Sequence, residues 1–176
     1  MAADTAWLRE YVRDIADFPE PGIVFKDIAP LLNNVDAFRF AVDALADHYC
    51  GDSIDRVVGI EARGFLFAAP LAYRCGAGFV PVRKPGKLPW ESVAEEYQLE
   101  YGADQLEMHI DAVAAGDRVL IVDDVLATGG TAAATVRLVQ GRGATVVGLG
   151  FLLELGFLNG AAKLEDLEVF SLLSYE

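Results

Sequence analysis

The chain has 176 residues, of which 53% are hydrophobic and 23% are charged, and its formal net charge is -13. This length is sufficient for one domain with a sizeable core, and the composition excludes a disordered chain. A chain this acidic repels nucleic acid, and no charge-free apolar stretch reaches membrane-spanning length. We therefore expect a single domain over residues 1–176 that binds neither nucleic acid nor a membrane.

The first predicted element is an amphipathic helix in the segment MAADTAWLREYVRDIADF, where apolar residues recur at helical spacing from Trp7 to Ile15. The segment lacks the apolar core of an export signal. We therefore expect a cytoplasmic protein.

Strand-like apolar runs then alternate with helical patterns. The expected strands span residues 56–60, 78–82, 118–122, 145–153 and 168–173, and the clearest helices span 64–73 and 131–140. This alternation predicts an α/β fold, with a mainly parallel twisted sheet flanked by helices. Ligands of such sheets bind at the carboxyl ends of the strands.

Residues 83–110 interrupt the alternation. Pro85, Gly86 and Pro89 break regular structure, and alternating runs follow at 97–101 and 106–110. The pattern predicts an antiparallel loop with a flexible tip at residues 102–104.

The stretch VLIVDDVLATGGTAAATV (119–136) places two acids, Asp123 and Asp124, between a buried strand and a small-residue loop. The free N–H groups of the following helix, with Gly129 and Gly130 allowing close approach, suit an anion. The loop has neither the Walker pattern nor the GxGxxG fingerprint. A plain strand-to-helix turn is the alternative, but two unpaired carboxylates at a buried strand end favour a ligand with hydroxyls or hydrated magnesium.

Two smaller features leave alternatives open. The basic residues cluster once, at Arg83, Lys84 and Lys87, which is either a solvated turn or an anion site. The cysteines, Cys50 and Cys75, form no CxxC pair; a disulfide stays open, but two buried free thiols are favoured in a cytoplasmic protein. The two histidines are too few for a metal site.

The segment VDDVLATGGT (122–131) resembles the phosphoribosyl-pyrophosphate motif of the type I phosphoribosyltransferases. Further segments resemble the adenine-specific members, in the same order over nearly the whole chain: FPEPGIVFKDIAPLL (18–32), GIEARGFLFAAPLA (59–72), VRKPGKLP with YQLEYG (82–102) and ELGFLNG (154–160). The resemblance implies a small hood built from the N-terminal residues, about 1–34, and from the C-terminal region. It also implies a flexible catalytic loop at about 83–110.

The implied activity is purine salvage. A homodimer would transfer the 5-phosphoribosyl group from 5-phosphoribosyl 1-pyrophosphate to adenine, giving AMP and pyrophosphate. Mg²⁺ would be held mainly by substrate and water, with no direct protein ligand.

The resemblance also implies residue roles. Asp123 and Asp124 face the ribose hydroxyls. The 5'-phosphate is held by the loop of Ala127, Thr128, Gly129, Gly130 and Thr131, and pyrophosphate is contacted by Arg63, Arg83, Lys84 and Lys87. Arg63 paired with Glu61 on the surface is the alternative for that arginine. Adenine stacks on Phe25, meets backbone groups of Val24 and Lys26, and is covered by Val125; ordinary core packing is the alternative for Phe25 and Val125.

One position bears on the choice of base. The 6-oxopurine members carry an aspartate where this chain has Ala127, so a proton near N7 of the base must come from elsewhere. The resemblance assigns it to Glu100, for which a solvated strand glutamate is the alternative. Two other functions stay open: an enzyme for hypoxanthine, guanine or xanthine, and a nucleotide-sensing regulator. A regulator would add a DNA-binding segment or a basic RNA face, which the acidic sequence does not suggest.

Overall fold

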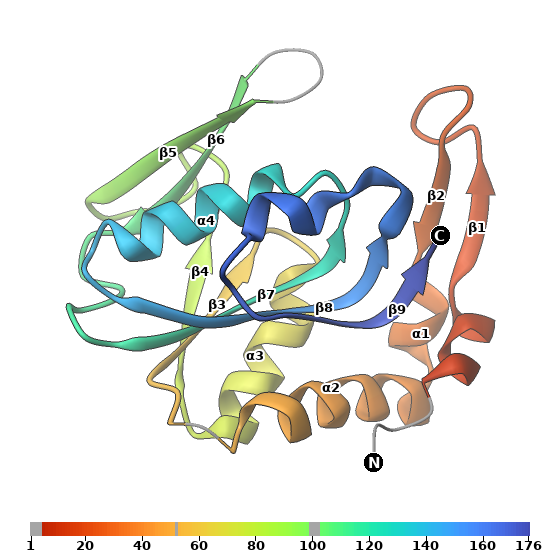
Figure 1. Ribbon diagram of the computed structural model, residues 1–176, viewed down its shortest axis with the longest axis horizontal. Coiled ribbons are helices and arrows are strands. Elements are labelled where there is room, and N and C mark those ends of the chain that lie inside the picture. Colours follow the sequence, from red (N-terminus) through yellow and green to blue (C-terminus); the bar gives the residue numbers. More distant parts are fainter. Residues whose placement is uncertain (1–4, 52, 99–102) are drawn as a thin grey trace.

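The computed structural model describes residues 5–51, 53–98 and 103–176. Its centre is a parallel five-stranded sheet in the order β4-β3-β7-β8-β9 (Figure 1). The strands are β3 (Arg56–Ile60), β4 (Gly78–Val82), β7 (Arg118–Leu126), β8 (Thr145–Leu155) and β9 (Val169–Tyr175). The predicted parallel sheet is therefore confirmed, and the main difference is that β7 continues through the two acids.

Helices cover both faces of the sheet. They are α1 (Ala29–Asn33), α2 (Val35–Tyr49), α3 (Gly64–Cys75) and α4 (Gly130–Gln140). Figure 1 shows α2 and α3 on one face and α4 on the other. Side chains alternate accordingly: Val57 packs in the cluster with α2 and α3, whereas its neighbour Val58 packs in the cluster with α4. We propose that the whole chain is one domain, because both clusters are built on the same sheet.

Local signals account for the helix ends. The side chain of Asn34 accepts hydrogen bonds from the backbone N–H groups of Asp36 (3.1 Å) and Ala37 (2.9 Å), which caps the start of α2. Helix α3 ends at Gly76, whose φ of 66° closes the last turn in the left-handed region.

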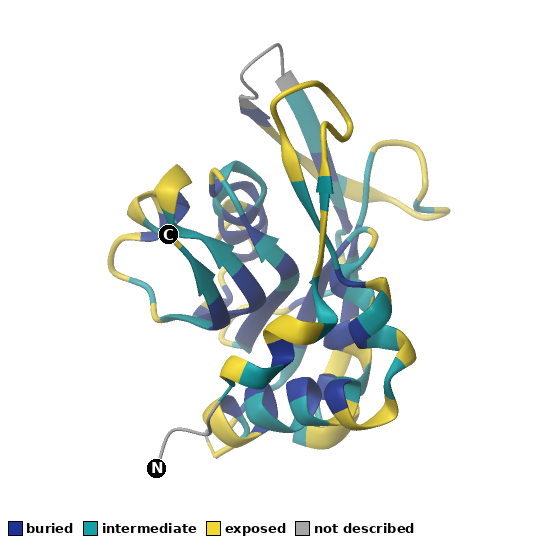
Figure 2. Cartoon of the chain, turned by 90° about the vertical axis from the view of Figure 1, so that its right-hand side faces the viewer, coloured by how far each residue is buried: buried dark blue, intermediate teal, exposed yellow. Residues whose placement is uncertain are grey.

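The predicted N-terminal helix is wrong beyond its first turns. A 3-10 helix, η1 (Ala6–Tyr11), is followed by β1 (Arg13–Ala16), which pairs antiparallel with β2 (Val24–Asp27). Ile15 therefore lies opposite Phe25 in a hairpin and not on a helix face. The hairpin turn carries Pro19, Pro21 and Gly22, and strand pairing across it overrides the helical spacing. Figure 2 shows that this hairpin is largely exposed.

The preference for free thiols is also wrong. Cys50 and Cys75 form a disulfide, with Cα atoms 4.9 Å apart, and both residues are half-buried. They lie at the ends of α2 and α3. These helices pack side by side on one face of the sheet, so their last residues meet although 25 positions separate them.

The antiparallel excursion is present as a ribbon of β5 (Ser92–Gln98) and β6 (Ala103–His109), in which Glu95 lies opposite Leu106. Its strands begin earlier than the sequence predicted. Ala103 and Asp104, which the sequence placed in the tip, belong to β6, so that part of the prediction is wrong. Residues 99–102, Glu100 among them, lie outside the described residues. In the described part of the chain, no helix has the length and apolar character needed to cross a bilayer.

Candidate active site

A cavity of about 360 Å³ opens at the carboxyl ends of β3 and β7. The chain leaves β3 toward β4 on one side and leaves β7 toward β8 on the other, so this is the point where the strand order reverses. The cavity is lined by Ile23, Val24, Phe25, Lys26, Glu61, Ala62, Arg63, Lys84, Tyr97, Asp123, Asp124, Val125, Ala127, Thr131 and Leu155. Its volume suits a small-molecule ligand.

The acid pair lies inside β7 and lines this cavity. Oδ2 of the buried Asp124 is 2.8 Å from Nε of Arg63, but the geometry gives this oxygen no hydrogen bond from the described residues. Oδ1 of Asp123 accepts a hydrogen bond from the Asp124 backbone N–H at 2.8 Å. Burial, followed by the negative charge of Asp124, holds the pKa of Asp123 well above its usual range. Two such carboxylates suit a ligand that donates hydrogen bonds or brings positive charge.

The glycine loop encloses a smaller hollow of about 70 Å³, lined by Asp123 and residues 125–132. Gly129 precedes the first helical residue of α4 with a φ of 75°, and no side chain caps this helix start. The first N–H groups of α4 are therefore available to a ligand, and the helix dipole favours an anion there. The loop therefore leads into an open helix N-terminus, and the phosphate itself stays a prediction.

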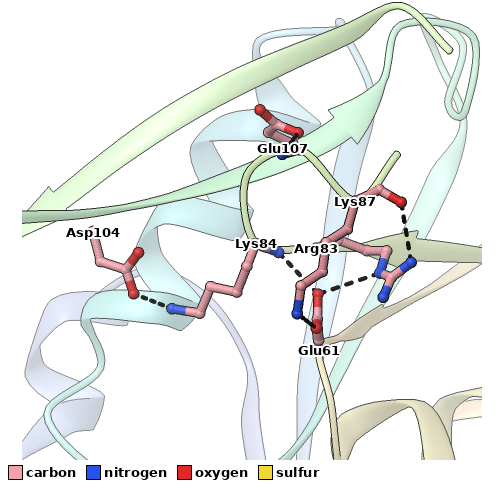
Figure 3. A network of polar contacts seen from close by, with 7 residues as sticks. Glu61, Arg83, Lys84, Lys87, Asp104 and Glu107 are labelled. Carbon is pink, nitrogen blue, oxygen red and sulfur yellow. Dashed lines mark hydrogen bonds and ion pairs between the residues drawn. The ribbon is translucent and has the colours of Figure 1, made fainter. Parts of the chain in front are cut away.

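Arg83, Lys84 and Lys87 all contact Glu61, a residue that the sequence analysis did not assign to the site (Figure 3). Oε2 of Glu61 accepts from Nε of Arg83 (3.2 Å) and from the backbone N–H of Lys84 (3.0 Å), and its other oxygen contacts Lys87. Burial alone would raise the pKa of Glu61, but hydrogen bonds from Lys87, Lys84 and Arg83 lower it below its ordinary value. The surface pair between Glu61 and Arg63 is not formed, since Arg63 contacts Asp124 instead.

A second polar group ties this cluster to the antiparallel ribbon. Nζ of Lys84 donates to the hydroxyl of Tyr97 (2.7 Å) and contacts Asp104, and the Tyr97 hydroxyl donates to the same carboxylate at 2.9 Å. The hydrogen bond from Lys84 lowers the pKa of Asp104. Burial alone would lower the pKa of Lys84, but its bonds to Asp104 and Tyr97 raise it.

Strand β2 supplies the opposite wall. Val24, Phe25 and Lys26, which the resemblance assigns to the base, all line the cavity, and Val125 lines it from β7. The Arg63 guanidinium lies over one face of the Phe25 ring, 4.9 Å from the ring centre. Nζ of Lys26 donates to Asp14 at 2.7 Å, which joins the two strands of the hairpin.

The structure therefore brings most of the predicted site residues together. Thr128, Gly129 and Gly130 lie in the adjoining hollow, whereas Arg83 and Lys87 do not line the cavity and reach it through Glu61. Sequence reasoning did not assign Glu61, Tyr97, Asp104 or Leu155 to the site. The usable signal for Glu61 was its position directly after the β3 strand, at the edge of the sheet where ligands bind.

The chain is similar to known proteins over nearly its whole length. The family model of the phosphoribosyl transferase domain matches residues 31–171. An adenine phosphoribosyltransferase from Thermobifida fusca is 61% identical over 173 residues, which cover 98% of each chain. The chain belongs to the adenine phosphoribosyltransferases. It is therefore a transferase with the type I phosphoribosyltransferase fold.

Solved structures of other adenine phosphoribosyltransferases have the same fold. The enzyme from Thermoanaerobacter pseudethanolicus matches with a TM-score of 0.94 at 51% identity, covering 97% of this chain and 99% of that one. The Saccharomyces cerevisiae enzyme, complexed with adenine and an imino-altritol bisphosphate, matches with a TM-score of 0.91 at 41% identity, covering 98% and 100%. The described residues contain no group of three or more His, Cys, Asp or Glu side chains that could hold a metal ion.

Proposed function

We propose that this enzyme transfers the 5-phosphoribosyl group from 5-phosphoribosyl 1-pyrophosphate to adenine, giving AMP and pyrophosphate in purine salvage. One observation carries the assignment of the site. The β7 acid pair, of which Asp124 is buried, an open helix N-terminus and the Phe25 ring from β2 meet around one cavity of about 360 Å³. These three features match a sugar diol, its 5'-phosphate and a flat base.

The donor would occupy the β7 side. The backbone of Ala127–Thr131 would bind the 5'-phosphate, because the N–H groups at the start of α4 have no capping side chain. Asp123 and Asp124 would accept hydrogen bonds from the two ribose hydroxyls. The raised pKa of Asp123 and the Asp124 oxygen without a hydrogen bond support this role. Both carboxylates would be stabilised by a hydrogen-bond donor or a cation.

The same two carboxylates fit hydrated Mg²⁺, which would be held mainly by substrate and water. When bound, the ion neutralises charge on the leaving pyrophosphate. This chain would contribute Arg63, Arg83, Lys84 and Lys87 to the same anion. Each of these cations now faces a carboxylate: Asp124 for Arg63, Glu61 for Arg83 and Lys87, and Asp104 for Lys84. Pyrophosphate would therefore compete with Glu61, Asp104 and Asp124 for these cations.

Adenine would bind against β2. The ring of Phe25 would stack on it, Val125 would cover its other face, and backbone groups of Val24 and Lys26 would meet its edge. The carboxyl of Glu100 would share a proton with N7 as the bond to N9 forms. Ala127 at the edge of the cavity supplies no acid for a 6-oxopurine.

We also propose a homodimer. Leu66 (43% exposed) and Tyr73 (87%) lie seven residues apart on one face of α3, and the exposed Phe79 (39%) of the edge strand β4 packs edge to face against Phe65 of the same helix. Exposed apolar side chains grouped in this way favour a protein interface. Sedimentation should give a mass near twice that of the chain, and Tyr73→Asp should shift it toward the monomer.

A cytoplasmic location stays a prediction, and the disulfide counts against a reducing compartment.

The assay that tests the function uses the purified protein with Mg²⁺, the pyrophosphate donor and each purine base in turn. Adenine should release pyrophosphate rapidly, and hypoxanthine and guanine should react poorly. Comparable efficiency with guanine would exclude the adenine assignment.

A further inference from the structure

The connection between β8 and β9 packs behind the phosphate loop. It consists of two short 3-10 turns, η2 (Gly156–Leu158) and η3 (Gly160–Leu164), joined at Asn159, whose φ is 51°. Figure 1 shows these turns beside the beginning of α4. Leu164 is buried in the same hydrophobic cluster as Ala132 and Leu138 of that helix. The connection is therefore anchored to the helix that follows the loop.

The contact between connection and loop is made by two glycine backbones. A Cβ atom on Gly160 would lie 2.1 Å from the carbonyl oxygen of Ala127 and 2.9 Å from the amide nitrogen of Gly129. A Cβ atom on Gly129 would lie 2.2 Å from the carbonyl oxygen of Gly160. These distances are shorter than carbon can approach backbone atoms, so neither position has room for a side chain.

Gly160 is needed for space and not for an unusual backbone conformation. Gly129 has a φ of 75°, whereas Gly160 is not among the glycines with positive φ. Alanine at position 160 would therefore fit its own backbone and would displace its neighbour. Gly160 is also not one of the residues that line the 70 Å³ hollow, so it contacts the loop from outside the anion site.

We propose that Gly160 is a positioning residue for the donor. Its backbone supports the peptide units of Ala127–Gly129 and holds them in the conformation that binds the 5'-phosphate. The proposal rests on the proposed function, because the anion in question is the phosphate of 5-phosphoribosyl 1-pyrophosphate and of AMP. Gly160 itself touches no substrate.

The test compares Gly160→Ala with wild type in binding AMP and adenosine, which differ only in the 5'-phosphate. The added methyl group should displace the loop, so AMP should bind about 10- to 100-fold more weakly, as expected for lost hydrogen bonds to a charged group. Adenosine affinity should be unchanged, since β2 and Val125 are untouched. In turnover, KM for the donor should rise and KM for adenine should not.

Gly156→Ala is the matched control in the same connection. Its Cβ atom would meet the carbonyl oxygen of Tyr175 at 3.3 Å and Oγ of Ser174 at 3.6 Å, away from the loop, and its φ is not positive. This variant should keep the preference of wild type for AMP over adenosine.

A second variant covers the case in which Gly160→Ala does not fold. Leu164→Ala loosens η3 against α4 without adding an atom near the loop, and it should reduce the preference for AMP severalfold. If Gly160→Ala folds and keeps the full preference of wild type for AMP over adenosine, the proposal is overturned. If Gly160→Ala does not fold, a Leu164→Ala variant that keeps this full preference overturns it. Wild type without any preference for AMP would instead refute the proposed function, and this inference with it.

Discussion

Nε of Arg63 lies 2.8 Å from Oδ2 of Asp124. This ion pair joins the segment that follows β3 to the second acid of the β7 pair. The arginine neutralises Asp124 more directly than Asp123. The neighbouring Asp123 is half-buried beside a negative charge, and its pKa is raised. Ionisation of Asp123 is therefore expected to destabilise the fold.

Asp123→Asn is expected to stabilise the fold and to weaken donor binding. A carboxyl whose pKa is raised in the fold contributes stability below its ordinary pKa of 3.8 and loses that contribution as the pH rises through the folded-state pKa. Asparagine does not ionise, so the variant should melt higher than wild type at pH 7, by about 2–4 °C for each kcal/mol recovered. The gain should shrink toward pH 3.

Donor affinity of the same variant should fall about tenfold or more, because a hydrogen bond to a charged group is lost. The exposed Asp111→Asn is the control and should change neither quantity. A variant that melts lower than wild type at pH 7 would show that Asp123 stabilises the fold as an anion.

Asp104→Asn should destabilise the enzyme only within a defined pH range. The pKa of Asp104 is lowered by the hydrogen bond from Lys84, so its contribution is present above the ordinary pKa of 3.8 and is lost as the pH falls through the folded-state value. The pKa of Lys84 is raised above 10.5, so the same pair is lost again when the pH rises through that raised value. Urea unfolding across this pH range should show that the variant has a lower free energy of unfolding than wild type. This difference should vanish at both ends of the range. A difference of equal size at pH 2 would assign the effect to packing.

Glu100→Gln should lower turnover by about 100- to 10,000-fold, as is typical of a general acid–base group. The Michaelis constant for adenine should change little, since the interaction is made in the transition state. Single-turnover measurement separates chemistry from product release. Wild-type rates in that measurement would make Glu100 a surface glutamate.

The control for Glu100 is Glu96→Gln on the same ribbon. Glu95 is unsuitable, because its carboxylate contacts Nε of Arg137 and ties the ribbon to α4. Glu96 is exposed, and only its backbone carbonyl accepts from Arg137. Glu96→Gln should be nearly silent.

Reduction of the Cys50–Cys75 disulfide should lower the melting temperature. A cross-link that closes 25 residues stabilises by about 3.5 kcal/mol in the chain-entropy model. Thiol titration of the unfolded, unreduced protein should find no free thiol, and dithiothreitol should lower the melting temperature of wild type. The double variant Cys50→Ser with Cys75→Ser should be insensitive to dithiothreitol. Two titratable thiols in the unreduced protein would contradict the cross-link.

Features encoded by neighbouring residues were predictable from the sequence. Strands Arg56–Ile60 and Gly78–Val82 have the predicted bounds, because strands of a buried parallel sheet are continuous apolar runs. The loop at 127–131 and the helix after it were also predictable, since Gly129 and Gly130 mark a local turn into an alanine-rich helix. Family membership was predictable because its motifs are contiguous.

Relationships between distant segments were decided only by the tertiary structure. Ile15 has helical spacing but lies in a hairpin, since pairing with Phe25 outweighs local preference. The partners of Glu61, the disulfide between α2 and α3, and the contact of Gly160 with Ala127 each join segments at least 22 positions apart. The sequence by itself determined the elements and the chemistry of the loop, because both depend on near neighbours. The tertiary structure decided which carboxylate pairs with which cation and which segment packs against the loop. Both depend on how the sheet brings the ends of its strands together, and no local sequence pattern predicts this.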